Sequence, residues 1–268
     1  MSDPIPEDVA HALAATRSRR GSFGDPMYFF TETASTNDVA ATLAERGAPE
    51  GATVCAAAQS AGRGRFGRTW FSPPGAGLYV SVVCRSEAAA PFVTLAGGVA
   101  VAEGIRTAAG LPVQIKWPND IVIEGMAPAR RRKLAGILAE ASTSADGLQY
   151  VILGFGINLH PAAYPPELSD RATSIEAELG RSADGAAVLA ETLASFAGWF
   201  AQLSSGDSRA VLSRWRELAP SATGAPLEWD APHGAVTGVS AGLADDGALL
   251  VKVHDRIERI ISGELRWK

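Results

Sequence analysis

Three arginines alternate with three glycines in residues 62–68, and Trp70 follows two positions later. Each arginine carries a permanent charge and a planar set of donors that fits a phosphate or a carboxylate. Each glycine lets the backbone approach a ligand closely and adopt a positive φ. Because the chain as a whole has a net charge of −5, this loop indicates a dedicated anion site. The indole of Trp70 suits stacking on a base.

The same residues satisfy the glycine spacing of a dinucleotide-binding fingerprint through Gly62, Gly64 and Gly67. That fingerprint requires a strand before it and a helix directly after it. Two prolines and a glycine follow at residues 73–75, and a strand-like run follows at residues 78–84, so no helix begins there. The sequence therefore argues against a Rossmann site. A solvated loop whose arginines serve solubility stays open on these residues alone.

Three further clusters combine polar groups with turns or glycines. Residues 116–120 read Lys-Trp-Pro-Asn-Asp and are typical of a β-turn between two strands. Lys133 opens an otherwise apolar strand, either as a solvated strand end or as a point charge for a carboxylate or phosphate. Residues 154–159 close another apolar strand, where glycines allow close approach. Asn158 there suits the edge of a base or merely ends a bulged strand.

The hydrophobic pattern predicts the elements that must position these clusters. We predict strands at residues 27–31, 52–58, 78–84, 113–117, 121–124, 133–142 and 149–157. We predict helices at residues 8–19, 91–110, 173–179, 184–203 and 207–218, and one that follows residues 35–38 and runs through Arg46. Ser35 and Thr36 are expected to cap the second helix. Four strands in quick succession favour a mainly antiparallel α+β sheet over a doubly wound one. Short strands after residue 220 indicate a small β-barrel.

Composition bounds the class of protein. A chain of 268 residues with 47% apolar residues fills one large domain, or a large and a small one. The acidic balance argues against a general nucleic-acid surface. Cys55 and Cys84 lie in apolar runs and read as buried free thiols, and the four histidines show no metal-ligand spacing. No basic-then-apolar leader opens the chain, and the longest apolar stretch is too short for a bilayer. We expect a soluble, cytoplasmic protein.

Five blocks in one consistent order resemble the biotin protein ligases (biotin–[acetyl-CoA-carboxylase] ligases). The blocks are residues 35–37 with Gln59, 62–70, 116–120, 133–140 and 154–159, within about residues 26–265. Phe66 departs mildly from the pattern, because the family often has a basic residue there. Larger bifunctional members begin with a DNA-binding winged helix. Only about 25 residues precede the catalytic part here, so the chain resembles the monofunctional type.

The resemblance implies a fold and a division of the chain. The fold is α+β, with a mixed, mainly antiparallel sheet flanked by helices, of the class II aminoacyl-tRNA synthetase-like type shared by biotin and lipoate ligases. A small SH3-like β-barrel follows. We expect an N-terminal helix and tail at residues 1–25, the catalytic domain at 26–220 and the SH3-like domain at 221–268.

The resemblance also implies an activity in two steps. Biotin and ATP form biotinyl-5′-AMP and pyrophosphate, with Mg²⁺, and a carrier lysine then takes the biotinyl group and releases AMP. The expected partner is a biotin carboxyl carrier domain of an acyl-CoA or pyruvate carboxylase. Neither nucleic acid nor membrane is expected as a partner, and the enzyme is expected to be a monomer or a homodimer.

Roles follow from the resemblance residue by residue. The charges expected in catalysis are Lys133, Arg65 and Lys116. The expected biotin contacts are Ser35, Thr36, Asn37, Gln59, Arg63, Gly64, Arg65, Lys133 and Gly136. The expected ATP and adenylate contacts are Gly62, Arg65, Arg68, Trp70, Lys116, Asn119, Lys133, Gly156 and Asn158. Asp120 is expected to orient Lys116 or to help position metal, and no other protein ligand for a metal is expected.

Other functions stay open on the sequence. A lipoate–protein ligase would share the fold but would need a long apolar tunnel in place of polar contacts for a ureido ring. A biotin sensor or repressor would bind without catalysis. An α+β interaction protein would use its glycines and arginines only to shape loops.

Overall fold

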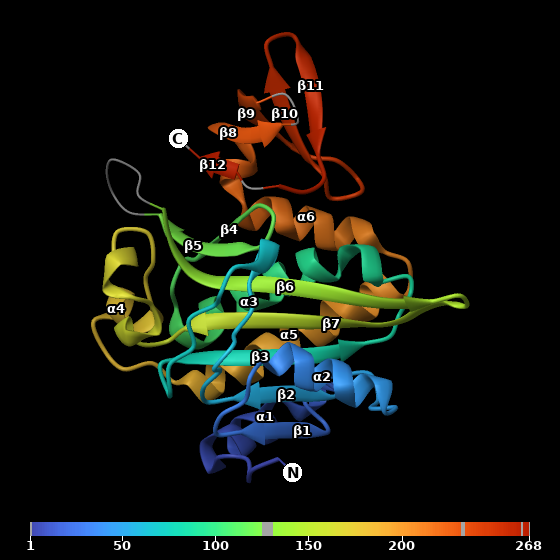
Figure 1. The fold of residues 1–268 in the computed structure, drawn as a ribbon, viewed down its shortest axis with the longest axis vertical. Helices are drawn as coiled ribbons and strands as arrows, with labels where there is room; N and C mark the ends of the chain where they lie inside the picture. The colour runs from blue at the N-terminus through green and yellow to red at the C-terminus, as the bar shows by residue number, and fades with distance from the viewer. Residues whose placement is uncertain (1, 125–130, 232–233, 264, 268) are drawn as a thin grey trace.

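The computed structural model describes residues 2–124, 131–231, 234–263 and 265–267. Its strands form a seven-stranded sheet and a five-stranded sheet, and the smaller sheet lies above the larger one in Figure 1. Helices flank the larger sheet on both faces. The predicted α+β class is therefore confirmed.

The large sheet has the order β1-β2-β3-β7-β6-β5-β4. Its strands are β1 (Met27–Phe30), β2 (Thr53–Ala56), β3 (Gly77–Cys84), β4 (Gln114–Lys116), β5 (Asp120–Glu124), β6 (Arg131–Ser144) and β7 (Gly147–Asn158). Only β1 and β2 pair in parallel among these described strands, and the other neighbours pair antiparallel. The mixed, mainly antiparallel sheet predicted from the closely spaced strands is confirmed.

Four helices are stacked behind one face of this sheet. The α-helices among the described residues are α1 (Glu7–Arg20), α2 (Thr36–Glu45), α3 (Val93–Ala109), α4 (Ile175–Leu179), α5 (Gly185–Ser204) and α6 (Ser208–Leu218). α3 packs on the sheet, α5 and α6 pack on α3, and α1 packs on α5. α2 covers the opposite face of β2, β3 and β7 (Figure 1). The face that carries α2 is the face on which the candidate site is built.

Glycines let the helical layer come close to its neighbours. A Cβ on Gly104 of α3 would lie 2.2 Å from the hydroxyl oxygen of Thr192 in α5, and one on Gly97 would lie 2.9 Å from Leu153 of β7. By length and composition, residues 90–109 and α5 would each be long and apolar enough to cross a bilayer, but 61% and 56% of these windows are buried inside the molecule. Their apolar faces are used in packing the core.

The start of α2 differs from the prediction in an informative way. Ser35 occupies the N-cap position, but its side chain makes no capping hydrogen bond, and Thr36 lies inside the helix. The backbone N–H of Thr36 instead donates to Oε1 of Gln59 at 2.8 Å. The orphan donor at the helix end is thus satisfied by a side chain from the segment after β2. The predicted N-cap position of Ser35 is confirmed, but the predicted capping by its side chain and by that of Thr36 is wrong, and the Ser35 hydroxyl is not committed to the helix.

The five-stranded sheet has the order β11-β10-β9-β8-β12 and is antiparallel throughout. Its strands are β8 (Thr223–Ala231), β9 (Gly234–Leu243), β10 (Leu249–Val253), β11 (Arg256–Ile260) and β12 (Leu265–Trp267). The short strand β12 was not predicted, because three residues carry too little periodicity. All five strands follow residue 222, where we placed the small domain. The boundaries at 25 and 220 stay predictions.

Candidate active site

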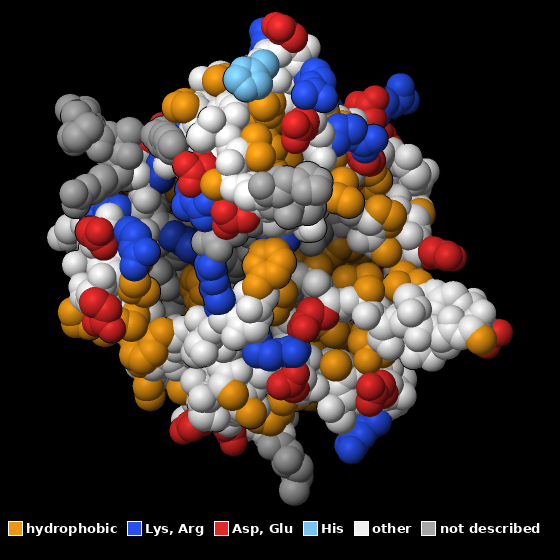
Figure 2. All heavy atoms as spheres, turned by 45° about the horizontal axis from the view of Figure 1, so that its top comes forward, with side chains coloured by type: hydrophobic (Ala, Val, Ile, Leu, Met, Phe, Trp, Pro, Cys, Tyr) orange, Lys and Arg blue, Asp and Glu red, His pale blue; other side chains and the backbone are white. Residues whose placement is uncertain are grey.

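A cavity of about 490 Å³ opens on the face of the large sheet that carries α2. Figure 2 shows Lys and Arg side chains gathered around a hollow, with hydrophobic side chains beside them. The segment between β2 and β3 runs across β7 and β6 in Figure 1 and forms one wall. The predicted residues that line the cavity are Ser35, Thr36, Asn37, Gln59, Arg63, Gly64, Arg65, Arg68, Trp70, Lys116, Asn119, Asp120, Lys133, Gly136, Gly156 and Asn158.

Gly62 is the predicted residue that does not line the cavity. A Cβ at this position would lie 2.4 Å from the carbonyl oxygen of Trp70 and 2.7 Å from the hydroxyl oxygen of Ser72. The backbone carbonyl of Gly62 accepts a hydrogen bond from the N–H of Trp70 at 2.9 Å. Glycine is therefore required here by packing at the base of the loop, and we withdraw Gly62 as an adenylate contact.

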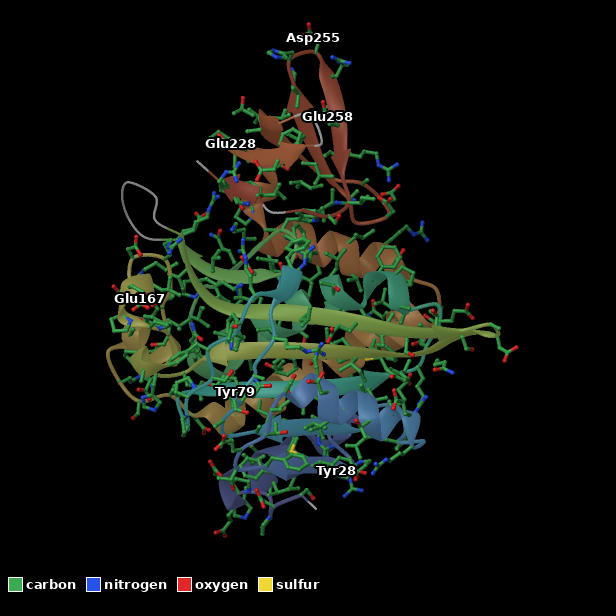
Figure 3. All side chains as sticks on the ribbon, in the orientation of Figure 1. Tyr28, Tyr79, Glu167, Glu228, Asp255 and Glu258 are labelled. Atoms are coloured by element: carbon green, nitrogen blue, oxygen red, sulfur yellow. The ribbon has the colours of Figure 1, made fainter. Side chains whose placement is uncertain are left out.

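Strand register aligns the floor of the site. Asp120 pairs with Gly136, Gly136 pairs with Gly156, and Gly156 pairs with Tyr79, which Figure 3 labels on β3. A Cβ on Gly156 would lie 2.4 Å from Nε1 of Trp70, and one on Gly136 would lie 3.1 Å from its ring. The two glycines thus make room for the indole of Trp70. That Nε1 is buried against the floor and has no hydrogen-bond partner among the described residues.

Polar side chains from α2, from β3 and from the segment between β2 and β3 join at the α2 end of the cavity. Gln59 accepts from the hydroxyl of Thr36 at 3.1 Å and donates from Nε2 to Ser72 at 2.9 Å. The hydroxyl of Ser81, fully buried in β3, donates to Oδ1 of Asn37 at 2.5 Å. Asn37 is itself 5% exposed. Since buried polar groups are stable only when paired, this network fixes a polar wall in one conformation.

Glu140 extends this network to the arginine loop. Its Oε2 accepts from Nδ2 of Asn37 at 2.6 Å and from Nη2 of Arg63 at 2.5 Å. The same Nη2 lies 2.9 Å from a carboxylate oxygen of Asp38 in α2. Two carboxylates thus neutralise Arg63, so its charge holds the loop against α2 and β6. Sequence reasoning missed both partners because they lie 25 and 77 positions away from it.

Asp120 holds both lysines of the cavity. Its Oδ1 lies 2.6 Å from Nζ of Lys133, and its Oδ2 lies 3.6 Å from Nζ of Lys116. Burial raises the pKa of Asp120, but the two lysine charges outweigh burial and hold that pKa below its ordinary value. The predicted orientation of Lys116 by Asp120 is present, and the closer contact is with Lys133. The carboxylate therefore fixes two cations at one end of the cavity.

Arg65 has different surroundings. Its Nη1 donates to Oδ1 of Asn119 at 3.2 Å, and its guanidinium carbon lies 4.8 Å from the ring centre of Phe66. Burial lowers the pKa of Arg65, and the charge of Asp120 opposes this without cancelling it. Within the described part of the chain, no carboxylate makes a salt bridge with Arg65. Its charge is directed into the cavity and not consumed by a partner.

The two asparagines predicted for adenosine have structural partners. Nδ2 of Asn119 donates to the carbonyl of Ile137 at 2.7 Å, which ties the β4–β5 turn to β6. Nδ2 of Asn158 donates to the carbonyl of Thr173 at 2.9 Å, and Asn158 is 4% exposed. Both side-chain amides therefore hold a backbone segment in place beside the cavity, in addition to any contact that they make with a ligand.

The segment after β7 covers part of the cavity and was not predicted. Residues of this segment and of the C-terminus that line it are Ala163, Tyr164, Pro165, Leu168, Ala172, Gly263 and Leu265. The backbone N–H of Lys133 donates to the carbonyl of Arg171, and the N–H of Thr173 donates to the carbonyl of Lys133, at 2.8 and 2.9 Å. The covering segment is thus anchored on the strand that carries Lys133.

The side chains that line the cavity determine whether the protein itself could bind a metal ion there. Asp120 is the single carboxylate among the described residues that line the cavity, and it already contacts two lysines. No group of three or more histidine, cysteine or acidic side chains suited to a metal occurs in the described ranges. The residues present therefore do not form a protein-held metal site, although they leave room for a divalent ion held by the phosphates of a nucleotide.

Comparison with known proteins gives the geometry a context. Residues 29–158 match the Biotin/lipoate A/B protein ligase family, and residues 230–265 match the Biotin protein ligase C terminal domain. The bifunctional ligase/repressor BirA of Bacillus subtilis is 34% identical over 247 residues, 90% of this chain and 74% of that protein. The biotin--[acetyl-CoA-carboxylase] ligase of Paracoccus denitrificans is 33% identical over 233 residues, which cover 82% of this chain and 91% of the length of that protein.

Solved structures show the same architecture. A biotin protein ligase from Aquifex aeolicus in complex with biotin and ATP superposes with a TM-score of 0.76 at 26% identity, over 91% of this chain and all of that one. A biotin protein ligase from Leishmania major in complex with biotinyl-5-AMP superposes with a TM-score of 0.58 at 26% identity, over 89% of this chain and 99% of that one.

Proposed function

Because the chain belongs to the Biotin/lipoate A/B protein ligase family and is related along most of its length to biotin protein ligases, we infer its function from that membership and from the cavity together. The protein is an ATP-dependent ligase that attaches biotin to a carrier lysine through biotinyl-5′-AMP. One observation carries the assignment to this cavity: a fixed polar wall at one end and a group of cations at the other share a single space.

The first step needs the cationic end. An oxygen of the biotin carboxylate attacks the α-phosphorus of ATP, the bond from that phosphorus to pyrophosphate breaks, and an acyl phosphate anhydride forms. Two anionic groups must approach each other, so fixed positive charge lowers the barrier. We assign this charge to Lys133, Lys116 and Arg65, because Asp120 and Asn119 hold them in place.

The polar end suits the head of biotin. Its ureido ring is uncharged and carries both donors and an acceptor. We assign Ser35, Thr36 and Asn37 to this ring, with Gln59 acting chiefly through Thr36. The backbone of Arg63 and Gly64 then meets the carboxylate end, while the Arg63 side chain serves as a clamp on α2 and β6.

The remaining wall suits the adenosine of ATP. Trp70 lies on the glycine pair of β6 and β7, and we assign its ring to the base. Asn119 and Asn158 are assigned to positioning the wall. We assign Arg68, which lines the cavity, to the phosphates. Mg²⁺ would enter with the ATP phosphates and would neutralise charge on the triphosphate.

The second step needs no protein nucleophile. The amine of the carrier lysine attacks the acyl carbon, the bond to the phosphate oxygen breaks, and AMP leaves. The acceptor is the carrier of a biotin-dependent carboxylase. We propose that it belongs to an acyl-CoA or pyruvate carboxylase, that the enzyme acts in the cytoplasm, and that it works as a monomer or a homodimer without nucleic acid.

One experiment tests the function. The protein is incubated with a biotin carboxyl carrier domain, ATP and Mg²⁺, with either biotin or lipoate, and the carrier is weighed by mass spectrometry. We expect one added biotin, pyrophosphate release that requires biotin, and no lipoyl product. A carrier whose acceptor lysine is replaced by arginine is the control. An unmodified carrier, or one modified only by lipoate, would contradict the proposal.

A further inference from the structure

Two aromatic rings at the cavity are exposed to solvent. Phe66 is 65% exposed and Phe71 is 48% exposed, and both line the cavity. Every other phenylalanine, tyrosine and tryptophan of the described ranges is buried or half-buried. The other large hydrophobic side chains that are exposed there do not line the cavity, and they are Ile5, Val239, Ile257 and Ile261. Within the described part of the chain, exposed aromatic surface is therefore confined to this cavity.

Core packing does not explain the position of Phe66. Its backbone has a φ of 56°, in the left-handed region that glycine adopts at lower cost. The guanidinium carbon of Arg65 lies 4.8 Å from its ring centre, and most of the ring is still exposed. A rare backbone conformation that places an apolar ring in solvent beside a cavity points to a function of that ring.

Phe71 projects from a backbone that is firmly held. Before it, the N–H of Trp70 donates to the carbonyl of Gly62 at 2.9 Å. After it, the carbonyl of Ser72 accepts from the N–H of Gln59 at 3.1 Å, and the hydroxyl of Ser72 accepts from Nε2 of Gln59 at 2.9 Å. These contacts fix the point at which Phe71 leaves the chain, so its exposure is not the result of a loose loop.

The small substrates leave both rings without a partner. The following inference rests on the proposed function, in which the polar wall takes the ureido ring, Trp70 takes the base and the cations take the phosphates. One reactant remains, the acceptor lysine of the carrier, which must reach the acyl carbon inside the cavity. A lysine side chain has a flexible stem of only four carbons. The carrier backbone on either side of that lysine must therefore come to the mouth of the cavity.

We propose that Phe66 and Phe71 form the docking contact for the carrier domain. In this arrangement the two rings pack against apolar surface beside the acceptor lysine and direct its amine into the cavity. Exposed apolar surface commonly marks a protein interface, and aromatic side chains contribute a large share of the binding energy there. The rings thus set the recognition of the carrier, whereas the formation of the adenylate depends on the residues inside the cavity.

The first test compares the unchanged protein with the double variant Phe66→Ala, Phe71→Ala. Biotinylation of a biotin carboxyl carrier domain is measured at varied carrier concentration, with biotin, ATP and Mg²⁺ saturating. We expect kcat/KM for the carrier to fall about tenfold or more, through a higher KM, because two interface rings are lost. Biotin-dependent pyrophosphate release without carrier should stay within about twofold of the original rate, since no charge of the cavity is removed.

Hydroxylamine separates docking from chemistry in the second step. Its nitrogen attacks the acyl carbon of the bound adenylate, AMP leaves, and biotinyl hydroxamate forms without any protein acceptor. The rate of hydroxamate formation should be the same in the double variant and in the unchanged protein. If the rings instead cover the adenylate or hold Arg65, hydroxamate formation or pyrophosphate release would change as much as carrier transfer, and the docking role would be refuted.

Ile257→Ala is the matched control. Ile257 is 55% exposed on β11 and does not line the cavity, so this variant also removes exposed apolar surface. It should leave the KM for the carrier unchanged. A KM for the carrier that is equal in the double variant, in Ile257→Ala and in the unchanged protein would overturn the inference and leave the proposed function standing. Failure of the unchanged protein to biotinylate any carrier would overturn the proposed function itself.

A cross-linking test asks directly what lies against the loop. The photoreactive amino acid p-benzoylphenylalanine replaces Phe66 in one variant and Ile257 in another, and each is irradiated with the carrier, biotin, ATP and Mg²⁺. We expect the probe at position 66 to label the carrier peptide that holds the acceptor lysine, several times more than the probe at position 257 does. Equal labelling from the two positions, or labelling of a second copy of the enzyme in place of the carrier, would contradict the proposal.

Discussion

Lys133 and Arg63 are both cations that line the cavity, but they differ in how many carboxylates neutralise their charge. Nζ of Lys133 has one carboxylate contact, at 2.6 Å, and lies 5.2 Å from the ring centre of Trp70. Arg63 is held between Asp38 and Glu140. A cation neutralised twice contributes little net charge to a transition state, so Lys133 is the more important of the two for chemistry.

We predict that Lys133→Ala lowers the rate of adenylate formation by about 10²–10³, because one aimed charge is removed from the phosphoryl transfer. Pyrophosphate release with biotin and ATP measures this rate. Lys252→Ala, which removes an exposed lysine of β10, should leave the rate unchanged. A rate within twofold of the unchanged enzyme would remove Lys133 from the mechanism.

Gly156 gives a second prediction at the scale of one residue. A Cβ there would lie 2.4 Å from Nε1 of Trp70, so Gly156→Ala must displace the indole from the floor of the cavity. We expect the KM for ATP to rise about tenfold or more, since stacking on a base contributes roughly 1–3 kcal/mol, while biotin binding changes little. Steady-state kinetics with each substrate varied in turn tests this split.

Gly198→Ala is the control for this substitution. Gly198 lies exposed in α5, and a Cβ there would meet nothing within 4 Å. Alanine should therefore leave both KM values unchanged and should stabilise the protein by about 0.5–1 kcal/mol, through helix propensity. Equal ATP kinetics in the two variants would mean that Trp70 does not form the base site.

Residue types could be predicted from the sequence more readily than their contacts. The arginines and glycines of residues 62–68 predicted an anion site, because these residue types have distinctive chemistry. The structure brings the arginines of this loop into one cavity with Lys116 and Lys133. Ser81 and Glu140 were missed because each looks like an ordinary strand residue. Their roles arise only when β3, β6 and α2 meet, and that meeting depends on packing over long separations in sequence.

At the scale of elements, the arginine loop is fixed mainly by polar contacts. The backbone N–H of Gly64 donates to the carbonyl of Arg68 at 2.7 Å, which closes a tight turn around Phe66. Phe66 is 65% exposed, with a left-handed φ of 56°. With little apolar anchorage, such a loop is expected to open readily when the cavity is empty and to become ordered over bound ligand.

We predict that Glu140→Gln loosens this loop. The change removes a charge from the contact with Arg63, and half-exposed ion pairs contribute up to about 1 kcal/mol. Hydrogen exchange in residues 62–70 should therefore be up to about fivefold faster without ligand. Biotin with ATP should restore most of the protection.

Glu124→Gln removes a carboxylate from a comparable ion pair with Arg131, and it should leave exchange in the loop unchanged. If the loop exchanged at the same rate in the Glu140→Gln variant as in the original protein, Arg63 would not be its clamp. Equal exchange with and without biotin and ATP would argue against the closing of the loop itself.

The elements were predictable to different degrees. Long strands and helices with clear periodicity, such as β7 and α5, were found nearly at their observed bounds. The start of α2 was predicted with the wrong capping partner, because the side chain that satisfies its N–H comes from Gln59, 23 residues on. The covering segment after β7 has no periodicity of its own, so its place over the cavity could not be inferred.

At the scale of the whole molecule, the small sheet reaches the site both through Leu265 of β12, which lines the cavity, and through the turn between β9 and β10. Nε1 of Trp117 donates to the carbonyl of Gly247, between β9 and β10, at 3.0 Å. Trp117 lies between Lys116 and the turn residue Asn119, and it is 3% exposed. Gly247 has a φ of 84°, and a Cβ there would lie 2.7 Å from Leu95 of α3. The turn is therefore wedged between the helical layer and the segment that carries Lys116.

We predict that this contact positions the nucleotide end of the cavity. Trp117→Phe keeps most of the ring but removes the donor and leaves the carbonyl of Gly247 unpaired, at a cost of about 1–3 kcal/mol. If that cost is borne by the position of Lys116 and Asn119, the KM for ATP should rise about fivefold to a hundredfold, with the KM for biotin little changed. Trp215→Phe is the matched control, because Trp215 is fully buried and its Nε1 has no partner among the described residues. Both variants should lose some stability through lost volume, and thermal unfolding measures that loss. If the two variants changed the KM for ATP equally, the effect would come from general destabilisation, and the small sheet would have no part in placing Lys116.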